Sequence, residues 1–147
     1  MKVLITGITG FVGSHLIDYI LKSHPEVQIH GTRRWRSDVS NIKHVFDKVH
    51  LHEGDLKDAH NVYELIEKIK PDRIFHLAAQ SFVPTSWESP AETLVTNIVG
   101  QANLLEAVKK FRVSGYDPII QIACSSEEYG KVEEGEIPIK ETNPLRP

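Results

Sequence analysis

The feature that most constrains this chain is a run of three glycines close to its start. Gly7, Gly10 and Gly13 are spaced as Gly-x-x-Gly-x-x-Gly, directly after an apolar β-type run and at the start of a segment with helical period. The first glycine permits a tight turn, the second lets a pyrophosphate approach the backbone, and the third lets helix and strand pack closely. The helix N-terminus then offers free N–H groups and a positive dipole to an anion. The order of strand, turn and helix favours a dinucleotide site over a tight turn without a ligand.

The rest of the chain alternates short β-type runs with longer segments of helical period, a pattern typical of βαβ units. Its 147 residues correspond to one domain. We therefore predict an α/β fold with a Rossmann-type doubly wound parallel sheet, truncated after about the fifth strand. The predicted strands are Lys2–Thr6, Val27–Gly31, Val49–Glu53, Arg73–Ala78 and Pro118–Ala123.

Apolar stripes and capping residues predict three helices. The first begins near Phe11, and the second is capped by Asp58. The third has Ser89 as its cap, Pro90 at the first helical position and Glu92 where a capping box requires it. Residues 32–47 show no clear period and are predicted to form a loop with at most one helical turn.

Composition argues against several classes of function. The net charge of −3 provides no broad attraction to phosphate backbones, so nucleic-acid binding is not expected. No run approaches the roughly 18 to 20 apolar residues of a membrane span, and the single Cys124 cannot form an internal disulfide. We expect a cytoplasmic protein with neither nucleic-acid nor membrane partners, in which Cys124 fills space in the core. His50 and His52 lack further ligands nearby, so no metal site is predicted.

Glycine or polar residues follow every predicted strand. They are Gly7, the 31–34 turn, Asp55, Gln80 and residues 125–127. Right-handed crossovers bring the carboxyl ends of parallel strands to one edge, and ligands bind there near the point where the strand order reverses. The sequence therefore predicts one ligand-binding edge formed by all of these turns.

The turn after the second predicted strand bears on the choice of dinucleotide. In NAD-binding folds an acidic residue at the end of this strand accepts hydrogen bonds from the ribose hydroxyls. Here that position is Gly31, and Thr32, Arg33 and Arg34 follow it. Because a guanidinium binds a 2′-phosphate through paired hydrogen bonds, we predict NADP rather than NAD. The alternative is that these arginines form a solvated loop face.

Three segments resemble a known family. The glycine spacing is similar to that of the extended short-chain dehydrogenase/reductase family, which includes nucleotide-sugar epimerases and dehydratases. The stretch from His76 to Pro90, which contains Leu77-Ala78-Ala79-Gln80-Ser81, resembles the GDP-mannose 4,6-dehydratases of that family. The segment Cys124-Ser125-Ser126-Glu127-Glu128-Tyr129-Gly130 resembles their Ser-Thr-x-Glu-x-Tyr-Gly, with serine in place of threonine.

This resemblance implies catalytic roles near the fifth strand. Ser125 takes the position of a catalytic threonine, and Glu127 takes that of the carboxylate that removes the sugar C5 proton. Ser81 and Ser126 are expected to contact the substrate, and Asn97 matches an asparagine that supports the active-site strand.

The resemblance also implies that Asp55 and the N–H of Leu56 bind the adenine edge. On chemistry alone Asp55 could equally cap a turn. The residues predicted to bind the cofactor are Gly7, Thr9, Gly10, Phe11, Val12, Gly13, Arg33, Arg34, Asp55, Leu56, Leu77, Ala78, Ala79 and Gln80.

As a whole, the resemblance implies a homo-oligomeric dehydratase that acts on GDP-mannose with tightly bound NADP. The alternatives are a GDP-4-keto-6-deoxymannose reductase, which carries a similar Ser-Ser-Glu-Glu-Tyr-Gly, another nucleotide-sugar epimerase, or a non-catalytic dinucleotide-binding protein. The family uses a Tyr-x-x-x-Lys pair, and no tyrosine of this chain precedes a lysine at that spacing. We therefore expect the chain to represent the front half of a family member, without its substrate domain, and to be inactive alone.

Overall fold

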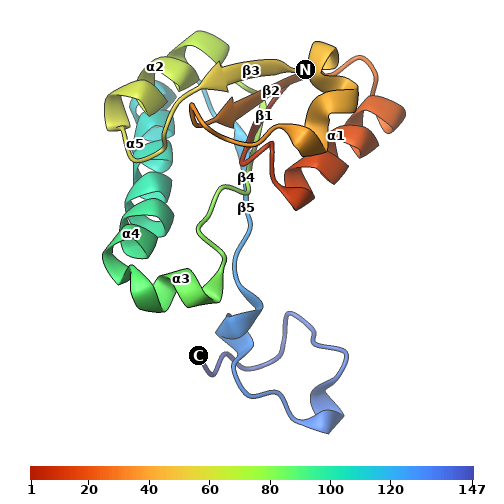
Figure 1. The fold of residues 1–147 in the computed structure, drawn as a ribbon, viewed down its shortest axis with the longest axis vertical. Coiled ribbons are helices and arrows are strands. Elements are labelled where there is room, and N and C mark those ends of the chain that lie inside the picture. Colours follow the sequence, from red (N-terminus) through yellow and green to blue (C-terminus); the bar gives the residue numbers. More distant parts are fainter.

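Five parallel strands form one sheet in the order β3-β2-β1-β4-β5 (Figure 1). The computed structural model describes residues 1–147. Because β2 and β4 lie on opposite sides of β1, the strand order reverses there, which confirms the predicted doubly wound Rossmann-type sheet. The strands are β1 (Lys2–Thr6), β2 (Gln28–Arg33), β3 (His50–Glu53), β4 (Arg73–His76) and β5 (Ile119–Ile122).

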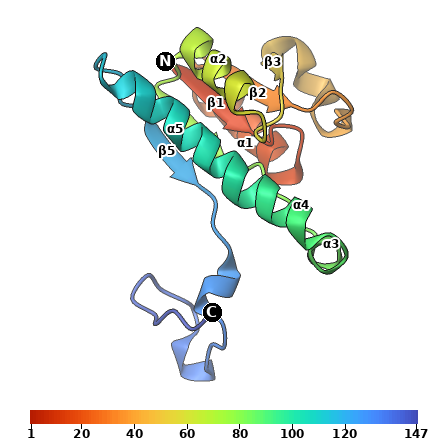
Figure 2. The ribbon, with the colours of Figure 1, turned by 90° about the vertical axis from the view of Figure 1, so that its left-hand side faces the viewer.

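Helices cover both faces of this sheet. They are α1 (Phe11–Ser23), α2 (Ala59–Ile69), α3 (Val83–Glu88), α4 (Pro90–Leu94) and α5 (Gly100–Arg112). Three 3₁₀ helices and one π-helical turn complete the set, at Ser40–Lys48, Ser126–Tyr129, Glu134–Glu136 and Val95–Val99 respectively. Helix α1 and the first 3₁₀ helix pack on one face, and α2 and α5 pack on the other (Figures 1 and 2). None of the helices has the length and apolarity needed to span a bilayer.

The alternation of side chains along β1 divides the core into two layers. Val3 and Ile5 pack toward α1 against Ile17, whereas Leu4 packs toward α2 against Ile66. None of these side chains is more than 2% exposed. Burial of an aliphatic side chain of this size stabilises the fold by about 1.5–3 kcal/mol. The central strand is thus fixed from both sides, and its carboxyl end is held in place for the site described below.

Beyond β5 the chain leaves the sheet and extends away from it (Figures 1 and 2). This segment is organised by Arg146, whose guanidinium makes paired hydrogen bonds of 2.7 and 2.8 Å with Glu136. Cys124 lies at its start and is exposed, so the prediction that it fills space in the core is wrong. The physical reason is that no residue from 123 to 147 is buried against the sheet.

Two segments between β2 and β3 differ from their prediction. β2 continues beyond Gly31, because Thr32 and Arg33 pair in parallel register with His52 and Glu53. Residues 40–48 are helical rather than mostly loop, with a break in the helical backbone at Val45. Both differences depend on neighbours that are distant in sequence.

The caps of the later helices were predicted with mixed success. Asp58 does cap α2, since its carboxylate accepts hydrogen bonds from the N–H groups of His60 and Asn61. Helix α4 begins at Pro90 as predicted, but Ser89 and Glu92 do not form a capping box. Glu92 instead accepts a hydrogen bond of 2.9 Å from the Lys57 ammonium, 35 positions away.

Candidate cofactor-binding and active site

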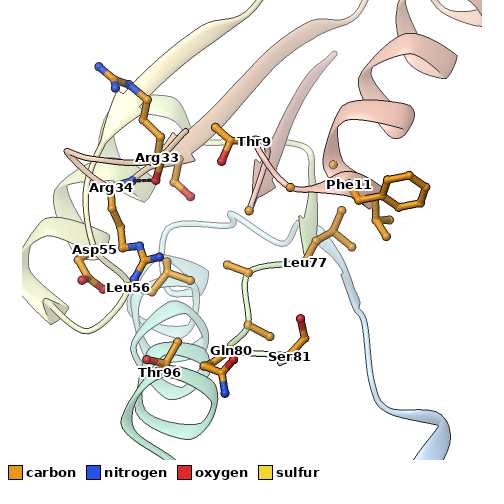
Figure 3. Close-up of a pocket in the computed structure, with 18 of the residues that line it drawn as sticks. Thr9, Phe11, Arg33, Arg34, Asp55, Leu56, Leu77, Gln80, Ser81 and Thr96 are labelled. Atoms are coloured by element: carbon orange, nitrogen blue, oxygen red, sulfur yellow. Dashed lines mark hydrogen bonds between the residues drawn. The ribbon is translucent and has the colours of Figure 1, made fainter. Parts of the chain in front are cut away.

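A cavity of about 500 Å³ opens at the carboxyl ends of β1, β2, β3 and β4 (Figure 3). Every residue predicted to bind the cofactor lines it, and so does Ser81. The turns after β1, β2, β3 and β4 therefore meet at one edge, as predicted. The sequence prediction missed six lining residues, namely Thr32, Ser37, Gly54, Phe82, Glu92 and Thr96. Three of these had a signal in the sequence: Thr32 lies in the turn predicted for this edge, Gly54 lies between a strand and Asp55, and Phe82 lies in the stretch that carries the resemblance.

The glycine turn packs too closely against its surroundings for any larger residue. Gly7 has a φ of +70°, and a Cβ there would lie 2.9 Å from the Cα and N of Ala78. A Cβ on Gly13 would lie 2.5 Å from the carbonyl oxygen of Gly7. Since all of these contacts are to backbone atoms, no rotation of a side chain relieves them. The turn therefore keeps its backbone exposed to the cavity, as a site for a close-lying anion requires.

The N-terminus of α1 opens on this cavity. Its cap residue, Gly10, makes no side-chain capping hydrogen bond, and the first turn contains no acidic residue. The first N–H groups and the positive end of the dipole are therefore available to an anion. The Asn41 side chain holds the turn in place by donating a hydrogen bond of 3.0 Å to the carbonyl oxygen of Thr9.

A buried hydroxyl joins the ends of β1 and β4. The Thr6 hydroxyl oxygen accepts hydrogen bonds of 3.2 Å from the N–H groups of both Leu77 and Ala78. It lies 2.8 Å from Nδ1 of His76, and burial lowers the pKa of this histidine. Because the oxygen already accepts two bonds, its own proton is left to donate to Nδ1 of a neutral imidazole. This network fixes the backbone of residues 76–78 beside the glycine turn.

Asn97 holds the next residues of the same wall. Its side chain accepts a hydrogen bond of 2.7 Å from the Gln80 N–H and donates one of 3.0 Å to the Gln80 carbonyl. Asn97 thus holds the segment that follows β4 at Gln80. Asn97 lies in the π-helical turn, an irregularity that is common where a helix residue serves a functional site.

The two arginines at the end of β2 lie differently. Arg33 is the last residue of β2, and its guanidinium is 3.9 Å from the Glu53 carboxylate. Arg34 begins a turn closed by a hydrogen bond of 3.0 Å from its N–H to the Ser37 hydroxyl. Figure 3 shows the Arg34 side chain reaching toward Leu56 while Arg33 points away from it. Arg33, rather than Gly31, is thus the residue at the end of the strand.

Asp55 caps a turn, which is one of the two roles that the sequence left open for it. One carboxylate oxygen accepts a hydrogen bond of 3.0 Å from the N–H of Lys57. The other lies 3.7 Å from the Lys57 ammonium. Asp55 and Leu56 also line the cavity, so a role in adenine binding is compatible with this geometry and stays a prediction.

The residues after β5 lie outside the cavity. Ser125, Ser126 and Glu127 are exposed, and none of them lines it. The Ser125 hydroxyl accepts a hydrogen bond of 3.2 Å from the Glu127 N–H and caps the short 3₁₀ helix that follows. The structure therefore does not bring the predicted catalytic residues to the edge shared by the other four turns.

The fold matches solved nucleotide-sugar enzymes. The structure of the UDP-glucose 4-epimerase of Thermus thermophilus in complex with NAD has a TM-score of 0.81 and 31% sequence identity. The match covers 100% of this chain and 45% of the epimerase. Fold and cavity together thus define a Rossmann-type domain of the epimerase/dehydratase class.

The sequence comparison narrows this class. The profile of the family described as GDP-mannose 4,6 dehydratase matches residues 4–147. The GDP-mannose 4,6-dehydratase of Yersinia enterocolitica is 41% identical over 99% of this chain, and the human enzyme is 38% identical over 98%. The chain belongs to the GDP-mannose 4,6-dehydratase family, which confirms the predicted resemblance. It spans 40% of the length of each of these two relatives.

Proposed function

We propose that this chain forms the NADP-binding part of a GDP-mannose 4,6-dehydratase, which converts GDP-mannose to GDP-4-keto-6-deoxymannose. One observation carries the proposal: every residue that the sequence assigned to the cofactor lines a single cavity at the carboxyl edge of the sheet. The names of the relatives that match nearly the whole chain support the same reaction.

The residues present fit a dinucleotide. The N-terminus of α1 and the glycine turn would hold the pyrophosphate, since a Cβ at Gly7 or Gly13 would collide with the backbone. Arg33 and Arg34 would bind the 2′-phosphate, and residues 77–80 would lie along the nicotinamide half. When bound, the nicotinamide ring accepts a hydride from the sugar and returns it. The chain's own contribution is to orient the two ends of the cofactor and to hold the wall at Gln80 rigid.

The substrate residues follow from the family resemblance. In this proposal Glu127 removes the proton at the sugar C5, and the Ser125 hydroxyl donates a hydrogen bond to the sugar. Ser81 lines the cavity and would contact the substrate directly. The proposed roles of Ser125, Ser126 and Glu127 rest on the resemblance, because these residues lie outside the cavity. The tyrosine and lysine pair of the family does not occur in this chain, so we expect it to bind the cofactor without turnover.

A second candidate is a reductase that acts on GDP-4-keto-6-deoxymannose. The segment that begins at Ser125 favours it, because serine stands where the dehydratases have threonine. The two reactions differ in their use of the cofactor. A dehydratase returns the hydride to the product and consumes no net NADPH, whereas a reductase oxidises one NADPH for each product molecule.

Calorimetric titration of this chain with NADP and with NAD tests the cofactor assignment. Hydrogen bonds to charged groups contribute about 1.5–3 kcal/mol, so we expect Arg34→Ala to weaken NADP binding by roughly 10- to 150-fold. Binding of NAD should stay unchanged. Arg112→Ala is the matched control, since Arg112 pairs with Asp117 and does not line the cavity. Equal affinity of the wild-type chain for NADP and NAD would refute the NADP assignment.

The reaction is tested on the protein as purified from its natural source. Incubation with GDP-mannose and NADP should yield the 4-keto-6-deoxy product, followed by NMR, without a net change in NADPH absorbance. Stoichiometric oxidation of NADPH by the 4-keto sugar would establish the reductase instead. Tight binding of the dinucleotide with neither reaction would establish a non-catalytic binding protein.

A further inference from the structure

One wall of the cofactor cavity is not held by apolar packing. Helices α3 and α4 and the π-helical turn after them bury none of their residues. Figures 1 and 2 show α3 and α4 extending beyond the sheet. Glu92 and Thr96 of this segment nevertheless line the cavity, together with Phe82 before it. The position of the wall therefore depends on polar contacts with the rest of the domain.

Two polar attachments hold this wall, one to Gln80 and one to the turn after β3. The first is at Gln80, which bonds to Asn97 and donates a hydrogen bond of 3.3 Å to the Thr93 hydroxyl. The second is the Lys57–Glu92 ion pair, with an ammonium-to-carboxylate distance of 2.9 Å. Lys57 follows Asp55 and Leu56 directly, so this pair joins α4 to the turn predicted to contact adenine.

The Lys57–Glu92 ion pair is reinforced and stays charged. The same Glu92 oxygen accepts a hydrogen bond of 3.2 Å from the Thr96 hydroxyl. The hydrogen bond from Lys57 lowers the pKa of Glu92, and the reciprocal bond raises the pKa of Lys57. Both groups are therefore ionised at neutral pH, and the negative charge of Glu92 is compensated in a cavity suited to a phosphate-bearing ligand.

We propose that Lys57 and Glu92 are positioning residues that set the width of the cavity at its adenosine end. This inference rests on the proposed function, because it requires a dinucleotide in the cavity. Without the pair, α4 is linked to the turn that carries Asp55 only through α5, whose Asn103 side chain donates hydrogen bonds of 2.8 and 3.2 Å to the carbonyls of Leu56 and Lys57. The wall beside the adenosine half then loses its direct attachment at Glu92. The nicotinamide end keeps its own attachment at Gln80, so the effect is confined to one half of the cofactor.

A double-mutant cycle on this chain measures the effect. Lys57→Ala, Glu92→Ala and the double variant are titrated by NMR with 2′,5′-ADP, the adenosine half of NADP, and with nicotinamide mononucleotide. The cycle cancels the effect of each charge on the anionic ligand and leaves the coupling of the pair. Partly exposed ion pairs couple weakly, so we expect a coupling of about two- to fivefold in the affinity for 2′,5′-ADP and none for nicotinamide mononucleotide.

The Glu106–Lys109 pair on α5 is the matched control. It has the same distance of 2.9 Å and does not line the cavity, so its cycle should show no coupling with either ligand. The exchanged variant, Lys57→Glu with Glu92→Lys, should recover most of the affinity for 2′,5′-ADP that the alanine variants lose. Additive effects of the two alanine substitutions, or equal coupling for both ligands, would overturn this inference but leave the proposed function intact. A wild-type chain that binds neither NADP nor 2′,5′-ADP would overturn the proposed function as well.

Discussion

A methyl group at Gly13 tests whether the glycine turn is as closely packed as the structure shows. The added Cβ would lie 2.5 Å from the Gly7 oxygen, 2.8 Å from the Ile8 oxygen and 2.9 Å from the Ile8 Cα. All three are backbone atoms of the turn that α1 rests on. The substitution therefore has to displace either the N-terminus of α1 or the turn itself, and both carry the proposed pyrophosphate site.

The expected loss of stability follows from two opposing effects. Forcing an extra carbon into a packed site destabilises by about 1–3 kcal/mol, whereas replacing glycine by alanine inside a helix stabilises by up to about 1 kcal/mol. Because the contact at 2.5 Å is to backbone, the cost lies at the upper end, about 2–3 kcal/mol. The net loss is then roughly 1–2 kcal/mol, which lowers the Tm of a domain of this size by roughly 3–8 °C. Affinity for the dinucleotide should fall with it, because the N–H groups of the turn no longer point at one anion.

Thermal unfolding followed by circular dichroism measures this loss, and calorimetric titration with NADP measures the affinity. Gly135→Ala is the matched control, since a Cβ there meets nothing within 4 Å. Gly10→Ala should be intermediate, because its single contact is 3.2 Å from the Gly7 oxygen. A Gly13→Ala variant as stable as Gly135→Ala, with unchanged affinity, would refute the packing argument.

Three further predictions are measured by unfolding experiments, in one case together with titration with NADP. Asp58→Ala removes the cap of α2 and should lower stability by about 1 kcal/mol in urea unfolding. Asn97→Ala removes both hydrogen bonds to the Gln80 backbone, so Tm and NADP affinity should fall together; a lower Tm with unchanged affinity would exclude a role at the site. Burial and the neighbouring histidines lower the pKa of His30 to about 4, below its unfolded value, so the unfolded chain takes up the proton first. Stability should be full above about pH 6.5 and fall as the pH approaches 4, and His30→Gln should flatten this decline.

The part of the site that the sequence predicts best is the part that depends on local geometry. The strand, the glycine turn and α1 form a continuous unit, and its residues line the cavity where the spacing placed them. Asp58 was predictable for the same reason, since a cap acts on N–H groups only two and three residues away. The conformations of these short segments follow largely from contacts within the segments, and Ala78 and Asn41 then hold the glycine turn from outside.

What the sequence could not predict depends on partners distant in the chain. Glu92 has the spacing of a capping box, yet the Lys57 ammonium competes for its carboxylate and forms the bond that is observed. From the sequence alone, Thr32 and Arg33 are assigned to a loop. In the structure they extend β2, because β3 provides backbone partners for them. Ser125 to Glu127 match a motif, but a motif does not determine the direction in which the chain leaves β5.

The cavity contains two kinds of anion-binding group, and they lie at different places along its edge. At the N-terminus of α1 the favourable groups are neutral N–H donors and a dipole, with no acidic side chain in the first turn to oppose an anion. At the end of β2 they are full charges, of which Arg33 is partly compensated by Glu53 at 3.9 Å while Arg34 is exposed. With a net charge of −3 the chain has no overall attraction for phosphate, so these local groups have to supply it. Because exposed charges are screened over about 8–10 Å in physiological salt, Arg34 acts only on a phosphate already brought close by the glycine turn. Under the proposed NADP assignment, the glycine turn would hold the pyrophosphate and Arg34 the 2′-phosphate, the group that distinguishes NADP from NAD.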